Sequence, residues 1–197
     1  MRILTLAAAA AVLMLGACDR LGIGGMGGGQ PALPPVQQGA TAPTKMAAAP
    51  AGVQRARIDE NTRTQLTQNI TQLLDGYQQN YTTGMAKIDG VNDEIAALEP
   101  MGDHRWVLPL TANTQYTFLG ACDGDCHNVD IELIDMRTGG VVASDMLPDD
   151  YPVVNFKPTA DGQYMARLLL QNCTVAPCYT GMRALSEAPG QAPTNKG

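Results

Sequence analysis

The feature that most constrains the fold of this chain is an alternation of apolar and polar side chains that begins near Trp106 and continues to Leu185. A period of two places successive side chains on opposite faces of a β-strand. The alternating runs are short and are separated by Gly, Pro, Asn and Asp, which favour turns. They predict strands over residues 106–110, 115–119, 129–133, 141–143, 153–156, 163–170 and 179–185. Strands of this length and spacing predict a mainly β fold, an antiparallel, jelly-roll-like β-sandwich over residues 101–186.

One of these runs also predicts which side chains meet water. Asp130 and Glu132 alternate with Val129, Ile131 and Leu133. In a half-buried strand the two sets of side chains face opposite sides of the sheet. We therefore expect the two acids to face solvent and the three apolar residues to face the core.

A second pattern, upstream of the strands, has the period of a helix. Apolar residues recur at spacings of three and four, at Leu66, Ile70, Leu73, Leu74, Tyr77 and Tyr81. This stripe predicts an amphipathic helix over residues 61–81, with Asp59 or Asn61 as its N-cap and Gly84 after its end. The apolar stripe could either pack on the following domain or dock a partner.

The other segments are assigned mainly from composition. A second, short helix is predicted over residues 92–98 and ends at Pro100, so we assign residues 53–100 to a helical segment. Residues 18–52 are rich in Gly, Pro, Ala and Gln, and such a composition predicts a disordered tether because it cannot bury a core. The end of the chain, residues 187–197, has a similar composition and is predicted to be a flexible tail.

The N-terminus has the layout of a secretory signal. Arg2 precedes an apolar run that ends in Leu15-Gly16-Ala17-Cys18. The run is too short for a transmembrane anchor, which needs roughly 20 apolar residues. The four residues resemble the bacterial lipobox, which implies a signal peptide over residues 1–17 and a mature N-terminal Cys18 that carries diacylglycerol and fatty acids such as palmitate. The resemblance therefore implies an exported lipoprotein held by its lipid to a bacterial membrane, in the cell envelope and facing the periplasm or the exterior.

The four other cysteines form two close pairs, Cys122 with Cys126 and Cys173 with Cys178. An even number of cysteines in an exported chain predicts disulfides. Three connectivities are open, and we favour the two local pairings because each brackets a short loop. A zinc site with four cysteines is the competing interpretation, although its usual spacing is C-x2-C and the compartment is oxidising.

Several short motifs occur in a fixed order along the predicted sandwich. They are the turn Cys122-Asp123-Gly124-Asp125-Cys126, the strand Val129-Asp130-Ile131-Glu132-Leu133, the link Asp149-Asp150-Tyr151-Pro152 and the strand start Gly162-Gln163-Tyr164. As a set they resemble the bacterial pre-peptidase C-terminal domain family, small β-sandwiches found on secreted peptidases and in other exported proteins. The resemblance spans about residues 106–185. No catalytic domain accompanies it here, so a role in protease secretion or targeting is not carried over.

Some members of that family bind calcium, and the resemblance implies Asp123, Asp125 and Asp130 as its ligands here. Calcium requires several hard oxygen ligands, and Asp123-Gly124-Asp125 supplies two carboxylates across a glycine turn. The alternative is that these aspartates cap turns and solvate the loop. We expect no other cofactor.

Composition and motifs argue against most enzyme classes. The formal net charge of -6 disfavours nucleic acid binding. No Gly-x-Ser-x-Gly motif surrounds Ser144 or Ser186, and the two histidines are His104 and His127. We therefore expect no enzymatic activity and predict a binding module whose partner is a protein or an envelope polymer. The alternatives are an assembly subunit that docks through the helix and a hydrolase that uses carboxylates.

Overall fold

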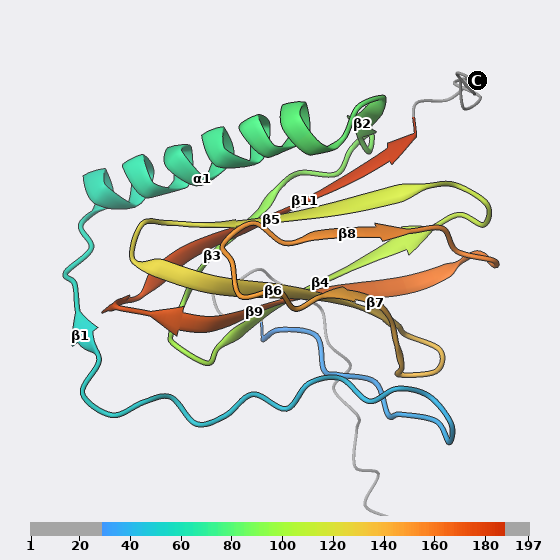
Figure 1. Cartoon of the computed structure of the whole chain (residues 1–197), viewed down its shortest axis with the longest axis horizontal. Helices are drawn as coiled ribbons and strands as arrows, with labels where there is room; N and C mark the ends of the chain where they lie inside the picture. Colours follow the sequence, from blue (N-terminus) through green and yellow to red (C-terminus); the bar gives the residue numbers. More distant parts are fainter. Residues whose placement is uncertain (1–28, 188–197) are drawn as a thin grey trace, which may run out of the picture.

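The computed structural model describes residues 29–187. The predicted lipobox with Cys18 and the tail after residue 187 lie outside the described residues. Two antiparallel sheets face each other, and one helix covers the outer side of one of them (Figure 1). The mainly β, sandwich-like fold is therefore confirmed.

The first sheet has the strand order β2-β11-β5-β8, and β3 pairs with the same edge of β11 as β2. Its strands are β2 (Met85–Lys87), β3 (Glu94–Leu98), β5 (Tyr116–Cys122), β8 (Val153–Phe156) and β11 (Cys178–Glu187). The second sheet has the order β4-β9-β6-β7. Its strands are β4 (Asp103–Leu110), β6 (Cys126–Asp135), β7 (Val141–Asp145) and β9 (Gly162–Cys173). Two short strands, β1 (Gln54–Arg55) and β10 (Val175–Ala176), form a separate parallel pair.

The core lies between the two sheets and follows the predicted alternation. Phe118 of β5, Ile131 and Leu133 of β6 and Leu168 of β9 are all almost completely buried there. The turn after β4 carries the chain from the second sheet to the first, since β4 pairs with β9 and β5 pairs with β11 and β8. Each predicted strand is present. Strands that follow each other in the sequence, such as β4 and β5, are not always hydrogen-bonded neighbours.

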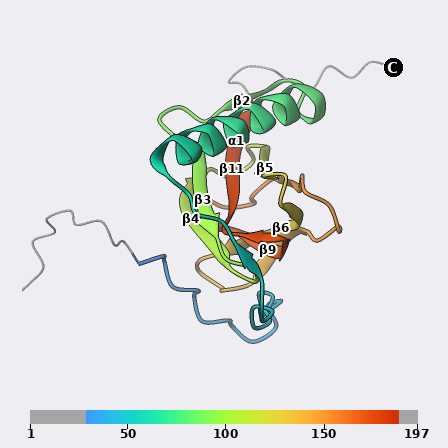
Figure 2. The ribbon, with the colours of Figure 1, turned by 90° about the vertical axis from the view of Figure 1, so that its left-hand side faces the viewer.

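The helix α1 (Glu60–Tyr81) confirms the predicted amphipathic helix and its cap. The Asp59 carboxylate accepts a hydrogen bond from the backbone N–H of Thr62 at 2.7 Å, which satisfies one of the unpaired donors of the first turn. Ile70 and Leu74 are fully buried against the outer face of the first sheet. The apolar stripe therefore packs on the sandwich of the same chain, as one of the two interpretations predicted (Figure 2).

The predicted helix over residues 92–98 is wrong, because Glu94–Leu98 forms the strand β3. Each residue of β3 has a partner in β11, from Leu98 opposite Cys178 to Glu94 opposite Met182. A helix this short is marginal on its own, so pairing with a long buried strand decides the conformation. The segment 53–100 is thus only partly helical, since β2 and β3 complete the first sheet.

The part of the predicted tether that the structure describes is bound to the sandwich and is not a free chain. Residues 29–52, here called the N-terminal strap, have almost no regular structure, but they lie along the outer face of the second sheet (Figure 1). The strap runs out to the β6–β7 turn, where the N–H of Gln37 donates to the carbonyl of Thr138 at 2.8 Å. It then returns, and the N–H of Val141 donates to the carbonyl of Thr41 at 2.9 Å. A low-complexity segment can therefore be ordered by the sheet that it covers.

The expectation that two acids face solvent is wrong, and for Glu132 the strap explains why. Asp130 and Glu132 are on the outer face of β6 as predicted, but they are only 2% and 3% exposed. Glu132 accepts hydrogen bonds from the backbone N–H of Thr44 at 2.9 Å and from the guanidinium of Arg167 at 3.1 Å. Around Glu132 the outer face of this sheet is therefore a second, polar interior, whereas Ser144 opposite it on β7 is exposed.

Candidate binding surface

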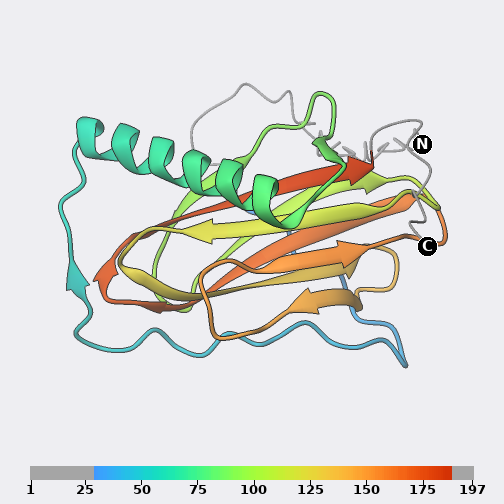
Figure 3. The ribbon, with the colours of Figure 1, turned by 45° about the horizontal axis from the view of Figure 1, so that its top comes forward.

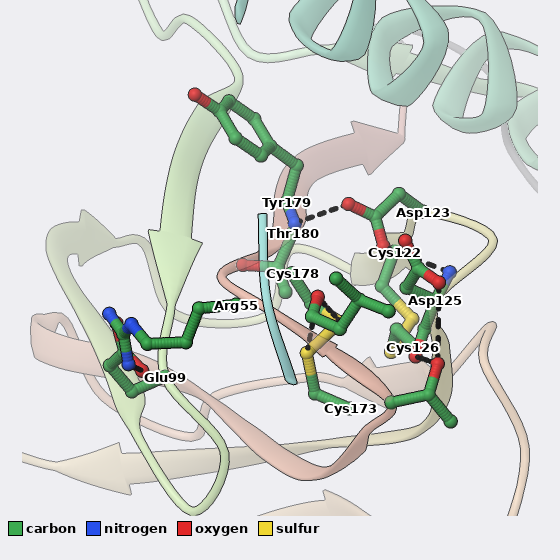
Figure 4. The surroundings of a disulfide bond; sticks show 12 residues. Arg55, Glu99, Cys122, Asp123, Asp125, Cys126, Cys173, Cys178, Tyr179 and Thr180 are labelled. Atoms are coloured by element: carbon green, nitrogen blue, oxygen red, sulfur yellow. Dashed lines mark hydrogen bonds and ion pairs between the residues drawn. A yellow bond between two sulfur atoms is a disulfide. The ribbon is translucent and has the colours of Figure 1, made fainter. Parts of the chain in front are cut away.

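The two disulfides are Cys122–Cys126 and Cys173–Cys178, the local pairing favoured from the sequence. The first closes the turn between β5 and β6, and the second closes the turn that leads from β9 to β11 (Figure 4). Cys126 and Cys173 lie opposite each other in neighbouring strands, so both loops are at one end of the sandwich. Loops this small constrain the unfolded chain only modestly, so the bonds chiefly fix the shape of this end.

Two of the predicted calcium ligands are used as turn residues. The Asp123 carboxylate accepts hydrogen bonds from the backbone N–H of Tyr179 at 2.6 Å and of Asp125 at 3.3 Å (Figure 4). Burial raises the pKa of Asp123 despite these hydrogen bonds. The Asp125 carboxylate accepts a hydrogen bond from the Thr174 hydroxyl at 3.3 Å.

The third predicted ligand, Asp130, lies further along β6 and accepts a hydrogen bond from the side-chain amide of Gln171 at 2.6 Å. Within residues 29–187, no group of three or more His, Cys, Asp or Glu side chains is placed to hold a metal ion. The set of Asp123, Asp125 and Asp130 is therefore not brought together.

The other residues singled out from the sequence occupy separate positions. His104 in β4 lies 3.1 Å from the Glu94 carboxylate across the edge of the sandwich. His127 follows Cys126 on the disulfide end, while Ser144 is in β7 and Ser186 is in β11. Among residues 29–187, the side-chain partner of His104 is Glu94, and neither serine hydrogen-bonds to a histidine as a Ser–His nucleophile requires.

An exposed aromatic cluster lies where the end of α1 meets the β7–β8 loop. Tyr77 and Tyr81, one turn apart on the helix, contact Tyr151 from the loop, with ring centroids 5.9 Å apart in both pairs. The rings of Tyr81 and Tyr151 are nearly parallel, at 8°, and the two residues are 52% and 40% exposed. Figure 3 shows the last turns of α1 above the first sheet, near the start of β8. We call Tyr77, Tyr81 and Tyr151, with the adjacent Asp149 and Asp150, the tyrosine surface.

The acids of the loop influence the phenol beneath them. Burial raises the pKa of Tyr77 to about 12, and the charges of Asp150 and Asp149 contribute to the rise. Met146 and Leu147 of the same loop are 41% and 61% exposed. The surface therefore combines aromatic faces with two carboxylates, and the loop that supplies Tyr151 also carries two exposed apolar side chains.

Such a combination suits a cationic side chain. The faces of aromatic rings attract Lys and Arg, and nearby carboxylates add charge complementarity. Tyr and Met are also enriched at protein interfaces. The helical spacing of Tyr77 and Tyr81 was visible in the sequence, but it left packing on the domain and docking of a partner both open. Their contact with Tyr151 is long-range, so no local pattern could reveal it.

Comparison with protein-family models and with curated proteins found no match for this chain. In the part of the chain that the structure describes, no helix combines the length and the apolar character needed to cross a bilayer.

Proposed function

We propose that this protein is an exported lipoprotein, anchored through Cys18, and that its β-sandwich is a non-catalytic binding module at the cell envelope. The lipobox-like sequence supports the anchor and the location. The two disulfides support an oxidising compartment, since such bonds persist outside the cytoplasm. The resemblance to the pre-peptidase C-terminal domain family remains a hypothesis that agrees with the sandwich.

The observation that carries the binding role is the tyrosine surface. Three tyrosines in mutual contact, two of them with exposed rings, are rigid anchors that lose little side-chain entropy on binding. The two adjacent carboxylates favour a partner with Lys or Arg at its contact point. We therefore propose a protein with a basic segment as the partner, in preference to an envelope polymer.

The other interpretations have less support. An assembly subunit docking through the helix would need a free apolar stripe, but Ile70 and Leu74 are buried against the first sheet. What α1 offers to a partner is its last turn, which belongs to the tyrosine surface. A hydrolase would use carboxylates such as those of Asp149 and Asp150, and activity screening of a variant with both changed to Asn tests that alternative directly.

The anchor and the surface are tested separately. Intact mass spectrometry of material from the native host should show a chain that begins at Cys18 and carries fatty acyl groups. A start at Met1 without lipid would overturn the anchor.

For the surface, cross-linking in intact cells should capture a specific protein with the wild type. The double variant Tyr81→Ser, Tyr151→Ser should lose that protein, whereas Val142→Ser should keep it, because Val142 is an equally exposed residue on the second sheet. Equal capture by both variants, or capture of a glycan in place of a protein, would overturn the assigned surface and partner.

A further inference from the structure

The N-terminal strap encloses a hollow that the proposed function does not use. Its outgoing limb supplies Leu33, Pro34 and Val36, and its returning limb supplies Pro43 and Met46. The hollow has a volume of about 500 Å³, and it lies over Arg167 of the central strand β9. Sites for small molecules commonly have volumes of roughly 300–1,000 Å³ and mostly apolar walls with a few polar groups.

Some of the polar backbone groups in these walls are used elsewhere or absent. Thr44 donates its N–H to Glu132 and accepts from Arg167 at 2.7 Å through its carbonyl, so both of its backbone groups face the sheet. Pro34 and Pro43 have no N–H to offer. These features leave aliphatic side chains as the main surface that a ligand would meet.

The strap is held in place at its far end by close contact with the β6–β7 turn. A Cβ on Gly139 would lie 2.3 Å from the carbonyl oxygen of Pro35, and one on Gly140 would lie 2.8 Å from the Cβ of Ala40. At the other end, Gln30 donates its side-chain amide to the carbonyl of Asp103 at 2.7 Å. The outgoing limb is therefore held at both of its ends, and the returning limb is held at the turn and at Thr44, so contacts with the sheet position both walls of the hollow.

The charged groups that line the hollow are both cationic. They are the guanidinium of Arg167, which is 3% exposed, and the ammonium of Lys45 at the strap surface. Arg167 uses its Nε and Nη1 atoms on Asp103, Thr44 and Glu132, and within residues 29–187 its Nη2 atom makes no hydrogen bond. An arginine carries five N–H donors, so two remain for a ligand. No carboxylate within this described part lies within ion-pair distance of Lys45.

We propose that the hollow binds an amphiphilic anion, a molecule with a carboxylate head and an apolar chain. The chain would occupy the aliphatic walls, and the head would meet Arg167 and Lys45. Asp103 and Glu132 are residues of the sheet, and their carboxylates already pair with Arg167. The preference for an anionic ligand therefore comes largely from Lys45 and from the Nη2 atom of Arg167. None of the residues that line this site belongs to the tyrosine surface.

The test uses the chain from residue 18 onward with Cys18→Ser, which carries neither the lipid nor the apolar run of residues 3–15 and therefore needs no detergent. The probe is dodecanoate below its micelle concentration. Titration calorimetry should show saturable binding with one site. Dodecyltrimethylammonium, which has the same chain and the opposite head charge, should bind at least about tenfold more weakly, a difference of one charge contact.

Matched variants make the assignment specific. Lys45→Glu should weaken dodecanoate about tenfold, while Lys157→Glu, an equal charge change after β8, should not. Leu33→Ala should weaken it several-fold, while Leu147→Ala on the β7–β8 loop should not. Absence of saturable binding, equal affinity for the cationic detergent, or equal effects of Lys45→Glu and Lys157→Glu would each overturn the proposal.

Discussion

Gly181 of β11 lies directly beneath Ile70 of α1, and a Cβ at that glycine would stand 2.4 Å from the Cγ2 atom of Ile70. A further contact at 3.3 Å would fall on the Cδ1 atom of Leu74. The helix can therefore approach the sheet this closely only because position 181 has no side chain. The contact joins the segment before the sandwich to the last strand of the chain.

Gly181→Ala should destabilise the domain by about 1–3 kcal/mol, because an extra methyl in a packed interface forces the helix outward. Gly76→Ala is the matched control, since Gly76 is within α1 and a Cβ there meets nothing within 4 Å. That control should stabilise by up to about 1 kcal/mol through helix propensity. Urea unfolding followed by circular dichroism measures both. A stable Gly181→Ala variant would show that the helix is not seated as described.

A buried ion pair beneath the end of α1 gives the second prediction. The Arg183 guanidinium, 1% exposed, donates to both oxygens of the Asp93 carboxylate at 2.9 and 2.7 Å, and it also meets Gln78 and the exposed Asp75. Burial by itself would raise the pKa of Asp93, but hydrogen bonds from Arg183 and Lys87 lower it overall. Asp93→Asn should cost about 3 kcal/mol, because it leaves a buried cation with a weaker partner.

The pH dependence of that loss has a defined sign. A carboxyl whose pKa is lower in the folded state stabilises the fold above its unfolded pKa of about 3.9, and this contribution disappears as pH falls through the lower, folded value. The difference between wild type and Asp93→Asn should therefore be full at pH 7 and shrink below about pH 4. Glu60→Gln, which breaks an exposed pair with Arg63 at 3.8 Å, should change stability by less than about 1 kcal/mol at either pH. A loss that is independent of pH would contradict the ion-pair explanation.

Asp130 gives a prediction of opposite sign. One of its oxygens accepts from Gln171, but its Oδ1 atom and the Oδ1 atom of Asn128 are buried without a hydrogen-bond partner in the described residues. Burial raises the pKa of Asp130, and the charges of Asp145 and Glu132 raise it further against the effect of Gln171. The ionised form is therefore disfavoured in the folded state, and Asp130→Asn should stabilise by about 1–2 kcal/mol at pH 7.

The gain should vanish at low pH, since a raised folded pKa is a penalty only while the carboxyl is ionised in the unfolded state. Asp89→Asn, the same charge change on an exposed residue, should have little effect at any pH. Thermal unfolding of the three proteins between pH 3 and pH 7 measures this. A destabilised Asp130→Asn at pH 7 would mean that the carboxylate has a partner that the described residues do not contain.

Much of the fold was predictable because it depends on local periodicity. The alternation around Ile131 and the stripe through Ile70 each specify an element and its buried face, and Asp59 specifies a helix start. Glu94–Leu98 was mistaken for a helix because its conformation is set by pairing with Cys178–Met182, about 80 residues away.

The candidate sites were not predictable for the same reason. Tyr151 meets Tyr77 only after the β7–β8 loop reaches α1, and the burial of Glu132 requires a low-complexity strap whose sequence resembles a flexible linker. The aspartates of the β5–β6 turn are the opposite case, because the sequence suggested a site there. Asp123 and Asp125 are predicted calcium ligands from the family resemblance, and their carboxylates accept hydrogen bonds from backbone N–H groups and a hydroxyl, partners that the sequence did not indicate.

The last prediction concerns the strap. Gly139 has φ 69° and lies against Pro35, whereas Gly52, also in the strap, has φ 78° and nothing within 4 Å of a Cβ. Gly139→Ala and Gly52→Ala therefore share the cost of a left-handed backbone, about 1–2 kcal/mol, but only the first also drives a methyl into the far end of the strap. We expect Gly139→Ala to lift that end from the β6–β7 turn.

Hydrogen exchange at the amides of Gln37 and Val141 should accelerate, because their acceptors lie across this contact. Amides of the core strands β6 and β9 should keep their protection in both variants, and Gly52→Ala should leave Gln37 and Val141 unchanged. Unaltered exchange at Gln37 in Gly139→Ala would show that the strap does not depend on this contact.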